Sequence, residues 1–262
     1  MPFITTKCIL SAWLSYEYFG LVVYGPLRSG KSSFSIQLLA ECYGAIKNPD
    51  WKKALTLDYE EWAEWFQENV EPDWDAWKKY MVFKPREFVQ KVKETSKKQR
   101  LLLVWDDAGF WLSHYDYHNP FLKAVSEYMN VLASDWAGVV FTTPNPKWLL
   151  THVRNLPGGH TGRVIKLTGN PYAWHLRKIR VYEGWMAPDL KKSGVRPIFE
   201  ENFSVKLPTD VFLEYDDVRR SYAEEAKNRM WETLEFIEKR YGRETAERKR
   251  REFEKLTGVK MG

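Results

Sequence analysis

The sequence lacks the features that mark secreted or membrane-spanning proteins. Cysteine occurs only twice among 262 residues, as Cys8 and Cys42, so at most one disulfide is possible and a reducing, cytoplasmic setting is favoured. No stretch approaches the roughly 18 consecutive apolar residues of a membrane span. The first residues also lack the basic flank and apolar run of a secretion signal. We therefore expect a cytoplasmic protein without a membrane-spanning segment.

What is present describes a globular chain with an uneven charge distribution. Hydrophobic residues make up 44% and aromatic residues 16%, enough to bury a full-sized core and to exclude a disordered or fibrous protein. The net charge is only +5, but residues 50–80 hold nine acidic and four basic side chains, whereas residues 152–206 hold ten basic and four acidic ones. The basic stretch indicates an anionic partner.

Short apolar runs alternate with helix-length segments through the first two-thirds of the chain. This alternation is typical of a parallel sheet covered by helices, so the expected fold class is α/β. The predicted strands are five, at 20–24, 80–84, 101–105, 138–142 and 163–168. The predicted helices lie at 31–44, 58–69, 86–98, 119–134 and 146–153.

The pattern changes after residue 168. A turn signal at 169–171, followed by alternation over 174–182, predicts a strand that returns antiparallel and ends the sheet in a hairpin. An apolar stripe spaced by three or four residues predicts a long C-terminal helix from about Asp210, with Gly242 as its expected break. The expected domains are a core with its hairpin over 1–206 and a helical appendage over 207–262.

The segment from Gly25 to Ser32 reads G-x-x-x-x-G-K-[ST], directly after an apolar strand and at the start of a helix. Glycines let backbone N–H groups turn inward around phosphate oxygens, and the helix N-terminus adds its positive end. Lys31 is expected to reach the β and γ phosphates, and Ser32 to bind Mg²⁺. The predicted nucleotide-binding residues are Gly25, Pro26, Leu27, Arg28, Ser29, Gly30, Lys31, Ser32 and Ser33.

A second motif ends the apolar strand at 101–105 in two carboxylates, Asp106 and Asp107. Unpaired buried charge is costly, so adjacent carboxylates at the carboxyl end of a buried strand indicate a functional site. With these two motifs, residues 18–170 resemble the P-loop NTPase superfamily, and the extra strand between the motifs resembles its RecA and AAA+ branch of ATPases. The resemblance implies ATP and Mg²⁺ as ligands, Asp106 holding the metal through water, and the strand of the second motif next but one to that of the first.

The resemblance also implies further catalytic residues. The branch usually has glutamate where this chain has Asp107, which leaves open whether Asp107 orients water, another residue does so, or a partner must complete the site. At the end of the fourth strand, Thr142, Thr143 or Asn145 is expected to sense the γ-phosphate, with Asn145 preferred. Arg154 resembles an arginine finger that acts across a subunit boundary, which implies a homo-oligomer. Arg163 is the reserve candidate, and a plain surface arginine is the alternative.

These expectations combine into a hypothesis: a cytoplasmic Mg-dependent ATPase with a catalytic set that lies in its first 154 residues. The catalytic candidates are Lys31, Asp107, Thr143, Asn145 and Arg154, and the metal candidates are Ser32 and Asp106. The basic 152–206 stretch and the basic tail at 248–251 suggest DNA as a partner, and so a motor, loader or packaging ATPase. Small ATPases of archaeal plasmids and viruses are similar in length and motif order.

Two other functions remain open. Residues 106–109 also fit the D-x-x-G loop of GTP-dependent switch proteins, but the position of the guanine reader, 145–148, lacks its aspartate. A small-molecule kinase would use the same phosphate-binding loop and would bind substrate with the acidic 58–75 stretch or with an arginine lid around a substrate pocket. His114 and His118 have a spacing that suits a metal but lack a third ligand. The candidates for an adenine pocket are Tyr16, Tyr18 and Phe19.

Overall fold

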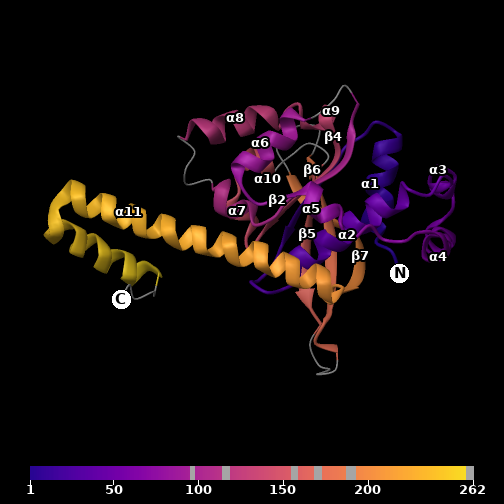
Figure 1. Ribbon diagram of the computed structural model, residues 1–262. Helices are drawn as coiled ribbons and strands as arrows, with labels where there is room; N and C mark the ends of the chain where they lie inside the picture. The colour runs from indigo at the N-terminus through magenta and orange to yellow at the C-terminus, as the bar shows by residue number, and fades with distance from the viewer. Residues whose placement is uncertain (95–97, 114–118, 155–158, 168–172, 187–192, 258–262) are drawn as a thin grey trace. The chain divides into compact units, whose positions relative to one another are not determined.

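The computed structural model describes residues 1–94, 98–113, 119–154, 159–167, 173–186 and 193–257. The chain divides into two compact units, Met1–Leu207 and Pro208–Gly262 (Figure 1). The first unit holds the sheet and residues 25–32, the loop predicted to bind phosphate, which we call the phosphate loop, and the second is a helical segment. Within the described residues, no helix is both long and apolar enough to cross a lipid bilayer.

The sheet of the first unit has seven strands in the order β2-β3-β4-β1-β5-β6-β7. The strands are β1 (Phe19–Tyr24), β2 (Met81–Val82), β3 (Arg100–Trp105), β4 (Trp136–Thr143), β5 (Gly159–Lys166), β6 (Leu176–Met186) and β7 (Ser193–Ser204). The first five in this order run parallel, and β4 lies between β1 and β3, as the resemblance implies. This mixed α/β architecture is consistent with a P-loop NTPase fold.

The prediction of a five-stranded sheet was wrong, because the sheet has seven strands. The strand β6 pairs antiparallel with β5, as expected, but β7 is a further antiparallel strand beside β6. An antiparallel strand with one polar face has no continuous apolar run, and β7 also contains a proline, so the sequence pattern of β7 is weak. The strand expected at 80–84 shrinks to the two residues of β2.

The helices of the first unit differ from the predictions mainly in their ends. They are α1 (Ile4–Leu14), α2 (Lys31–Ala45), α3 (Trp51–Ala54), α4 (Tyr59–Asn69), α5 (Ala76–Tyr80), α6 (Pro85–Lys93), α7 (Ala108–Trp111), α8 (Pro120–Tyr128), α9 (Leu132–Asp135) and α10 (Thr151–Arg154), with the 3₁₀ helix η2 (Pro146–Trp148). The helices expected at 119–134 and 146–153 are each two short segments. Helix α1 was not predicted.

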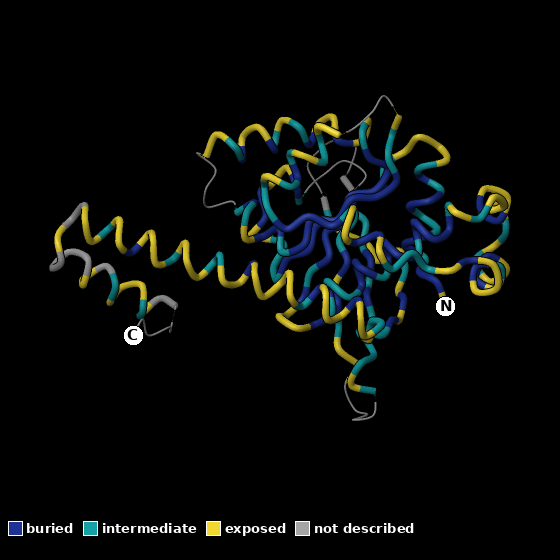
Figure 2. The backbone as a smooth tube through the Cα atoms, viewed as in Figure 1, coloured by how far each residue is buried: buried dark blue, intermediate teal, exposed yellow. Residues whose placement is uncertain are grey.

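The core occupies both faces of the parallel strands (Figure 2). On one face, Phe88 of α6 and Leu122 of α8 pack in a cluster with alternate residues of β3 and β4, including Trp105 and Phe141. On the other face, Ile9 of α1 lies against Gly138 of β4. Burial on both faces explains the continuous apolar runs that made β1, β3 and β4 predictable.

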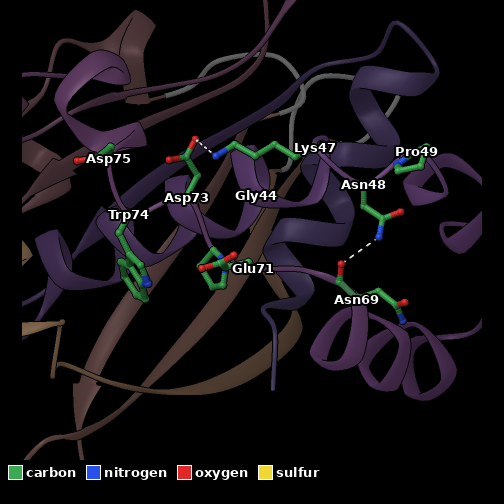
Figure 3. Close-up of a pocket in the computed structure, with 10 residues that line it drawn as sticks. Gly44, Lys47, Asn48, Pro49, Asn69, Glu71, Asp73, Trp74 and Asp75 are labelled. Atoms are coloured by element: carbon green, nitrogen blue, oxygen red, sulfur yellow. Dashed lines mark hydrogen bonds and ion pairs between the residues drawn. The ribbon is translucent and has the colours of Figure 1, made fainter.

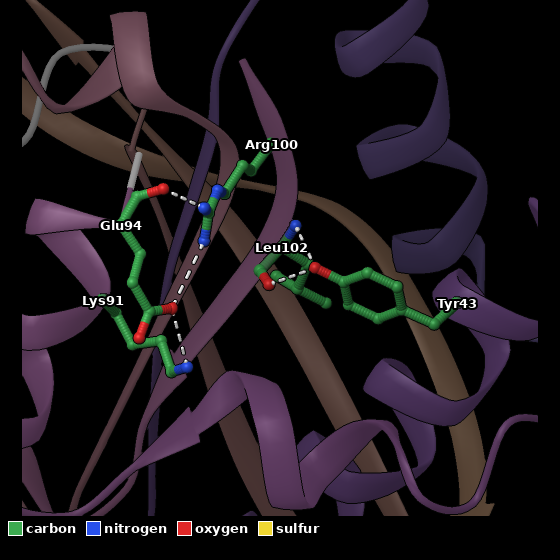
Figure 4. A network of polar contacts seen from close by, with 5 residues as sticks. All are labelled: Tyr43, Lys91, Glu94, Arg100 and Leu102. Carbon is green, nitrogen blue, oxygen red and sulfur yellow. Dashed lines mark hydrogen bonds and ion pairs between the residues drawn. The ribbon is translucent and has the colours of Figure 1, made fainter. Parts of the chain in front are cut away.

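Helix α2 is fixed to the edge of β3 that the short β2 leaves uncovered. The Tyr43 hydroxyl donates to the Leu102 carbonyl oxygen at 2.9 Å and accepts from the Leu102 N–H at 3.4 Å (Figure 4). At the start of the same strand, Arg100 contacts the Glu94 carbonyl oxygen and carboxylate, which also pairs with Lys91. The phosphate loop therefore begins a helix that is anchored at its far end.

The N-terminus of α1 is held by two carboxyl groups, which we call the acidic anchor: Glu41 of α2 and Glu201 of β7. Glu41 accepts from the Phe3 N–H at 2.9 Å and the Thr6 hydroxyl at 2.5 Å, and Glu201 accepts from the Thr5 hydroxyl at 2.6 Å. Burial raises the pKa of Glu41 to about 8 and that of Glu201 to about 7. The acidic anchor joins the first helix to the sheet and to α2.

The second unit consists of α11 (Thr209–Thr257), which begins one residue before the expected start. The helix is interrupted at Gly242, whose φ of 76° and ψ of 160° are not helical. The predicted break is therefore confirmed. Glycine populates this backbone region without the steric cost that a Cβ imposes.

Candidate functional site

The site begins where β1 ends. Its loop turns through three residues with positive φ, namely Gly25 at 156°, Arg28 at 60° and Gly30 at 101°, before α2 starts at Lys31. Such turns direct successive N–H groups into a concavity that binds anions. A Cβ on Gly30 would lie 2.4 Å from the Val205 side chain, so only glycine fits this position. The hydroxyl of Ser29 is buried and, among the described residues, has no hydrogen-bond partner.

The Lys31 side chain folds over this loop. Its Nζ donates to the Gly25 carbonyl oxygen at 3.1 Å and to the Pro26 carbonyl oxygen at 3.0 Å, and the residue is only 7% exposed. A buried ammonium group needs acceptors, and the loop's own carbonyl groups serve here. The amine therefore lies at the phosphate loop, where phosphate oxygens would provide better, charged acceptors.

The two motifs meet through hydrogen bonds to one carboxylate oxygen. Asp106 Oδ1 accepts from the Ser32 hydroxyl at 3.1 Å and from the Thr142 hydroxyl at 2.6 Å. Asp106 is 1% exposed and Thr142 is fully buried. The order β1-β4-β3 produces this arrangement, because it puts the carboxyl end of β4 between the phosphate loop and the end of β3.

Asp107 follows in a strained conformation. Its φ of 50° is left-handed, a region that costs a residue with a Cβ roughly 1–2 kcal/mol. The Asp107 N–H donates to the Thr142 hydroxyl oxygen at 2.8 Å, so Thr142 contacts both carboxylate-bearing residues. Strain of this kind persists where the surrounding structure enforces it, and here it turns the chain sharply after Asp106.

The other residues expected to sense phosphate lie beside this cluster. The Thr143 hydroxyl donates to the Asn145 carbonyl oxygen at 3.0 Å and lies against Gly109, where a Cβ would approach it to 2.3 Å. Asn145 Oδ1 accepts from the Lys147 N–H and so caps η2. The structure thus brings Thr142 into contact with Asp106, whereas the Asn145 amide oxygen caps a helix.

The two candidate arginine fingers occupy different elements. Arg154 is partly exposed at the end of α10, and the four residues that follow it lie outside the described part of the chain. Arg163 is exposed on β5, opposite Tyr24 of β1, the residue that precedes the phosphate loop. Of the two, only Arg163 lies on a strand that pairs with β1.

Sequence reasoning missed the role of Arg177, the second residue of β6. The Arg177 Nε donates to the Ser29 carbonyl oxygen at 2.9 Å, and Nη1 donates to the carbonyl oxygens of Trp174 and Leu176 at 2.6 and 2.7 Å. Arg177 is 7% exposed. Sequence analysis included Arg177 only among the ten basic residues of the 152–206 stretch. No local sequence pattern connects Arg177 with Ser29, which lies 148 residues earlier in the chain.

The aromatic residues expected around adenine lie away from the loop. Phe19 begins β1 and stacks on His160, about 17 Å from the end of that strand at about 3.3 Å per residue. The ring of the partly buried Tyr18 lies against Gly20, and Tyr16, which precedes it, is exposed. An exposed aromatic side chain near the loop is Trp174, which is 62% exposed, with Lys206 Nζ 5.8 Å from its ring centroid.

A cavity of about 610 Å³ lies at the opposite end of α2 (Figure 3). It is lined by residues of the acidic stretch, including Glu71 and Asp73, and its polar groups pair with one another, as Lys47 does with Asp73 at 3.0 Å. Helix α2 separates it from the phosphate loop by roughly 20 Å, at 1.5 Å per residue. A kinase substrate bound there would be too far from a γ-phosphate to react.

Metal binding by protein side chains alone is not supported. The described residues contain no group of three or more His, Cys, Asp or Glu side chains that could hold a metal ion, and His114 and His118 lie outside the described residues. Ser32 and Asp106 fit Mg²⁺ differently, since this ion is bound by one or two protein oxygens together with phosphate oxygens and water. Their shared contact places both oxygens at the phosphate loop.

Comparisons with known proteins identify one distant viral relative. No protein-family model matches the chain. The chain is 22% identical over 241 residues to the uncharacterized protein B-251 of Sulfolobus spindle-shape virus 1, which covers 87% of this chain and 84% of that protein. It is also similar to the N-terminal domain of the zonular occludens toxin from Neisseria meningitidis, at 12% identity and a TM-score of 0.33, over 74% of this chain and 97% of the other. Neither comparison assigns an activity to this chain, so the functional conclusion depends on the site.

Proposed function

We propose that the protein binds and hydrolyses ATP in a Mg-dependent reaction at the loop between β1 and α2. The observation that carries the proposal is the contact between the two motifs, in which Ser32 and Thr142 both donate to Asp106 Oδ1. These residues are far apart in the sequence, and a fully buried carboxylate with two hydroxyl donors at the mouth of an anion-binding loop has no obvious structural purpose.

Each residue has a distinct task in this proposal. The loop N–H groups and Lys31 bind the phosphates, and the positive φ of Gly30 lets the backbone approach them closely. Ser32 and Asp106 hold Mg²⁺, the serine directly and the aspartate through water. When bound, this ion neutralises the charge that develops on the transferred phosphoryl group.

Asp107 is the proposed group that orients the attacking water. Its left-handed backbone turns the residue away from the strand direction, and its N–H is fixed on Thr142. This hydrogen bond ties the backbone at Asp107 to β4. A carboxylate that is one methylene shorter than glutamate reaches less far, so we expect slow turnover by the isolated protein.

Hydrolysis of ATP by purified protein tests the proposal. Wild-type protein should release phosphate only with Mg²⁺ present, and Lys31→Ala should lower the rate to background. Asp107→Asn should lower kcat while ATP binding is retained, because the water-orienting group does not contribute to binding. Full activity of Lys31→Ala would overturn the assignment of the phosphate loop.

The site is further proposed to work in a homo-oligomer. Three large apolar side chains that follow the carboxyl ends of β1, β3 and β4 are exposed, namely Leu27 at 70%, Phe110 at 50% and Trp148 at 45%. A second copy that covered them would bring an arginine, Arg154 or Arg163, to the γ-phosphate. If Arg154 acts across the boundary, a mixture of Lys31→Ala and Arg154→Ala proteins should regain activity that neither has alone. A mixture that stays inactive would leave Arg154 without this role.

DNA is the proposed macromolecular partner, bound through the 152–206 stretch and the basic tail at 248–251. The charge is partly neutralised within the hairpin, since Lys178 and Arg180 pair with Glu200 and Arg196 pairs with Glu183. Binding should therefore be weaker than the ten basic residues suggest. DNA affinity should fall steeply between about 50 and 200 mM salt, because each phosphate contact releases counterions and higher salt opposes that release. Absence of binding at about 50 mM salt would contradict the proposal.

A further inference from the structure

Arg177, a buried cationic residue of β6, contacts the phosphate loop from its outer side. The Arg177 guanidinium donates three hydrogen bonds, all to backbone carbonyl oxygens, and one of these belongs to Ser29 inside the loop. No carboxylate in the described part of the chain lies within ion-pair distance of Arg177. Burial lowers the pKa of this guanidinium from its usual value, as expected for a charge removed from water.

The Ser29 carbonyl belongs to the same peptide group as the Gly30 N–H. A trans peptide is planar, so its C=O and N–H point in opposite directions. A hydrogen bond that holds the Ser29 carbonyl outward therefore turns the Gly30 N–H inward, toward the concavity of the loop. Charge-assisted donation to a carbonyl oxygen also polarises the peptide and strengthens its N–H as a donor.

This peptide needs such a restraint because glycine lets it rotate. Gly30 has a φ of 101°, and without a Cβ the neighbouring peptide can adopt more than one orientation. The Val205 side chain, just after β7, closes the space beside Gly30, and Gln37 of α2 donates to the Ser204 carbonyl oxygen at 2.7 Å. The segment from β6 to Val205 thus lies against the phosphate loop at Ser29 and Gly30 and against α2 at Gln37.

We propose that Arg177 is a positioning residue that fixes the Ser29–Gly30 peptide with its N–H toward bound phosphate and adds positive charge behind the loop. The inference rests on the proposed function, since it assigns a second cation to the same nucleotide site. Arg177 acts through the backbone and differs in this from Lys31, whose amine is proposed to bind the phosphates directly. It also makes the hairpin part of the nucleotide site.

Calorimetric titration of Mg-ATP and Mg-ADP into full-length protein tests the proposal. Arg177→Met keeps the side-chain length and removes the charge and donors, so both nucleotides should bind about 10- to 100-fold more weakly than to wild type. The matched control is Arg180→Met on the other, partly exposed face of the same strand, where Arg180 pairs with Glu200, and it should change affinity less than about twofold. If Arg177→Met does not fold, Arg177→Gln replaces it, with the same expected direction.

A spectroscopic readout separates positioning from a general structural role. In protein labelled with ¹⁵N-glycine, the Gly30 amide resonance should move on removal of the Arg177 guanidinium and should respond less to Mg-ADP than in wild type. Equal affinities of wild type and the Arg177 variants, or an unchanged Gly30 resonance, would overturn the inference while leaving the ATPase proposal intact. Failure of wild-type protein to bind either nucleotide would instead overturn the proposed function.

Discussion

Two clusters of buried polar groups in the first unit differ in the charge they bury. At the phosphate loop, the cations Lys31 and Arg177 donate to neutral backbone carbonyl groups. In the acidic anchor, Glu41 and Glu201 accept from hydroxyl and N–H groups, and burial shifts both toward their neutral forms. The first cluster presents buried positive charge on a loop shaped for anions. The second is complete within the protein, so we interpret it as structural.

The largest expected effect concerns the metal. Asp106→Asn should lower Mg-dependent hydrolysis by about 100-fold or more, because a neutral amide holds the ion poorly. The thermal unfolding midpoint should stay equal or rise, since the variant buries a neutral group in place of a charge. Glu201→Gln in the acidic anchor is the matched control and should retain wild-type hydrolysis. A comparable loss of hydrolysis in Asp106→Asn and Glu201→Gln would contradict the assignment of the first cluster to catalysis and of the second to structure.

A smaller effect is expected at Thr142, which contacts both Asp106 and Asp107. Thr142→Val keeps the shape and removes the hydroxyl, so kcat should fall by about tenfold, the value of one charged hydrogen bond. Thr142→Ser should restore most of the rate. Steady-state kinetics of the two variants measure this, and a Ser variant no better than Val would argue against the hydroxyl's role.

The acidic anchor should make stability depend on pH. The pKa values of about 8 for Glu41 and about 7 for Glu201 exceed the ordinary carboxyl value of 4.5. At pH values between the ordinary and the raised pKa, the folded protein therefore binds more protons than the unfolded chain. Stability should therefore fall as pH rises from about 5 to about 8, because the unfolded chain releases these protons at lower pH than the folded protein does. Urea unfolding across this range should show a flatter curve for the Glu41→Gln, Glu201→Gln double variant. If unfolding free energy depended on pH in the same way for wild type and variant, the pKa values of Glu41 and Glu201 would not be raised in the folded protein.

The smallest expected effect is that of removing one buried hydrogen bond between neutral groups, which serves as a reference for the other variants. Tyr43→Phe removes only the hydroxyl that bonds to Leu102 and should cost about 1 kcal/mol of unfolding free energy at all pH values. Urea titration at pH 5 and pH 8 measures both points. A cost that changes with pH would mean that this edge of β3 is coupled to the ionisable groups nearby.

Local sequence patterns predicted the parts of the site that lie within single segments. An apolar strand, a glycine loop and a helix follow one another at 19–45, and a second apolar strand ends directly in Asp106. Predictions failed where the structure depends on distant contacts. The hydroxyl of Thr142 meets Asp106 only through the order of the strands, and Arg177 meets Ser29 across 148 residues.

Helix α1 and strand β7 also escaped sequence analysis, each for a physical reason. Helix α1 buries Thr5 and Thr6 together with Ile9 and Leu10, so its buried face is not marked by apolar residues alone. Its polar contacts are made by the acidic anchor, whose members come from α2 and β7. The strand β7 contains charged residues that pair across the hairpin, and such a pattern resembles a solvated loop.

Calorimetric titration of Mg-ADP into wild-type and Lys31→Ala protein tests the central claim most directly, namely that the loop after β1 is an anion site and the acidic anchor is not. We predict saturable binding by wild type, binding reduced to background in Lys31→Ala, and unchanged binding in Glu201→Gln. Equal binding by wild type and Lys31→Ala, or none by wild type, would contradict the account.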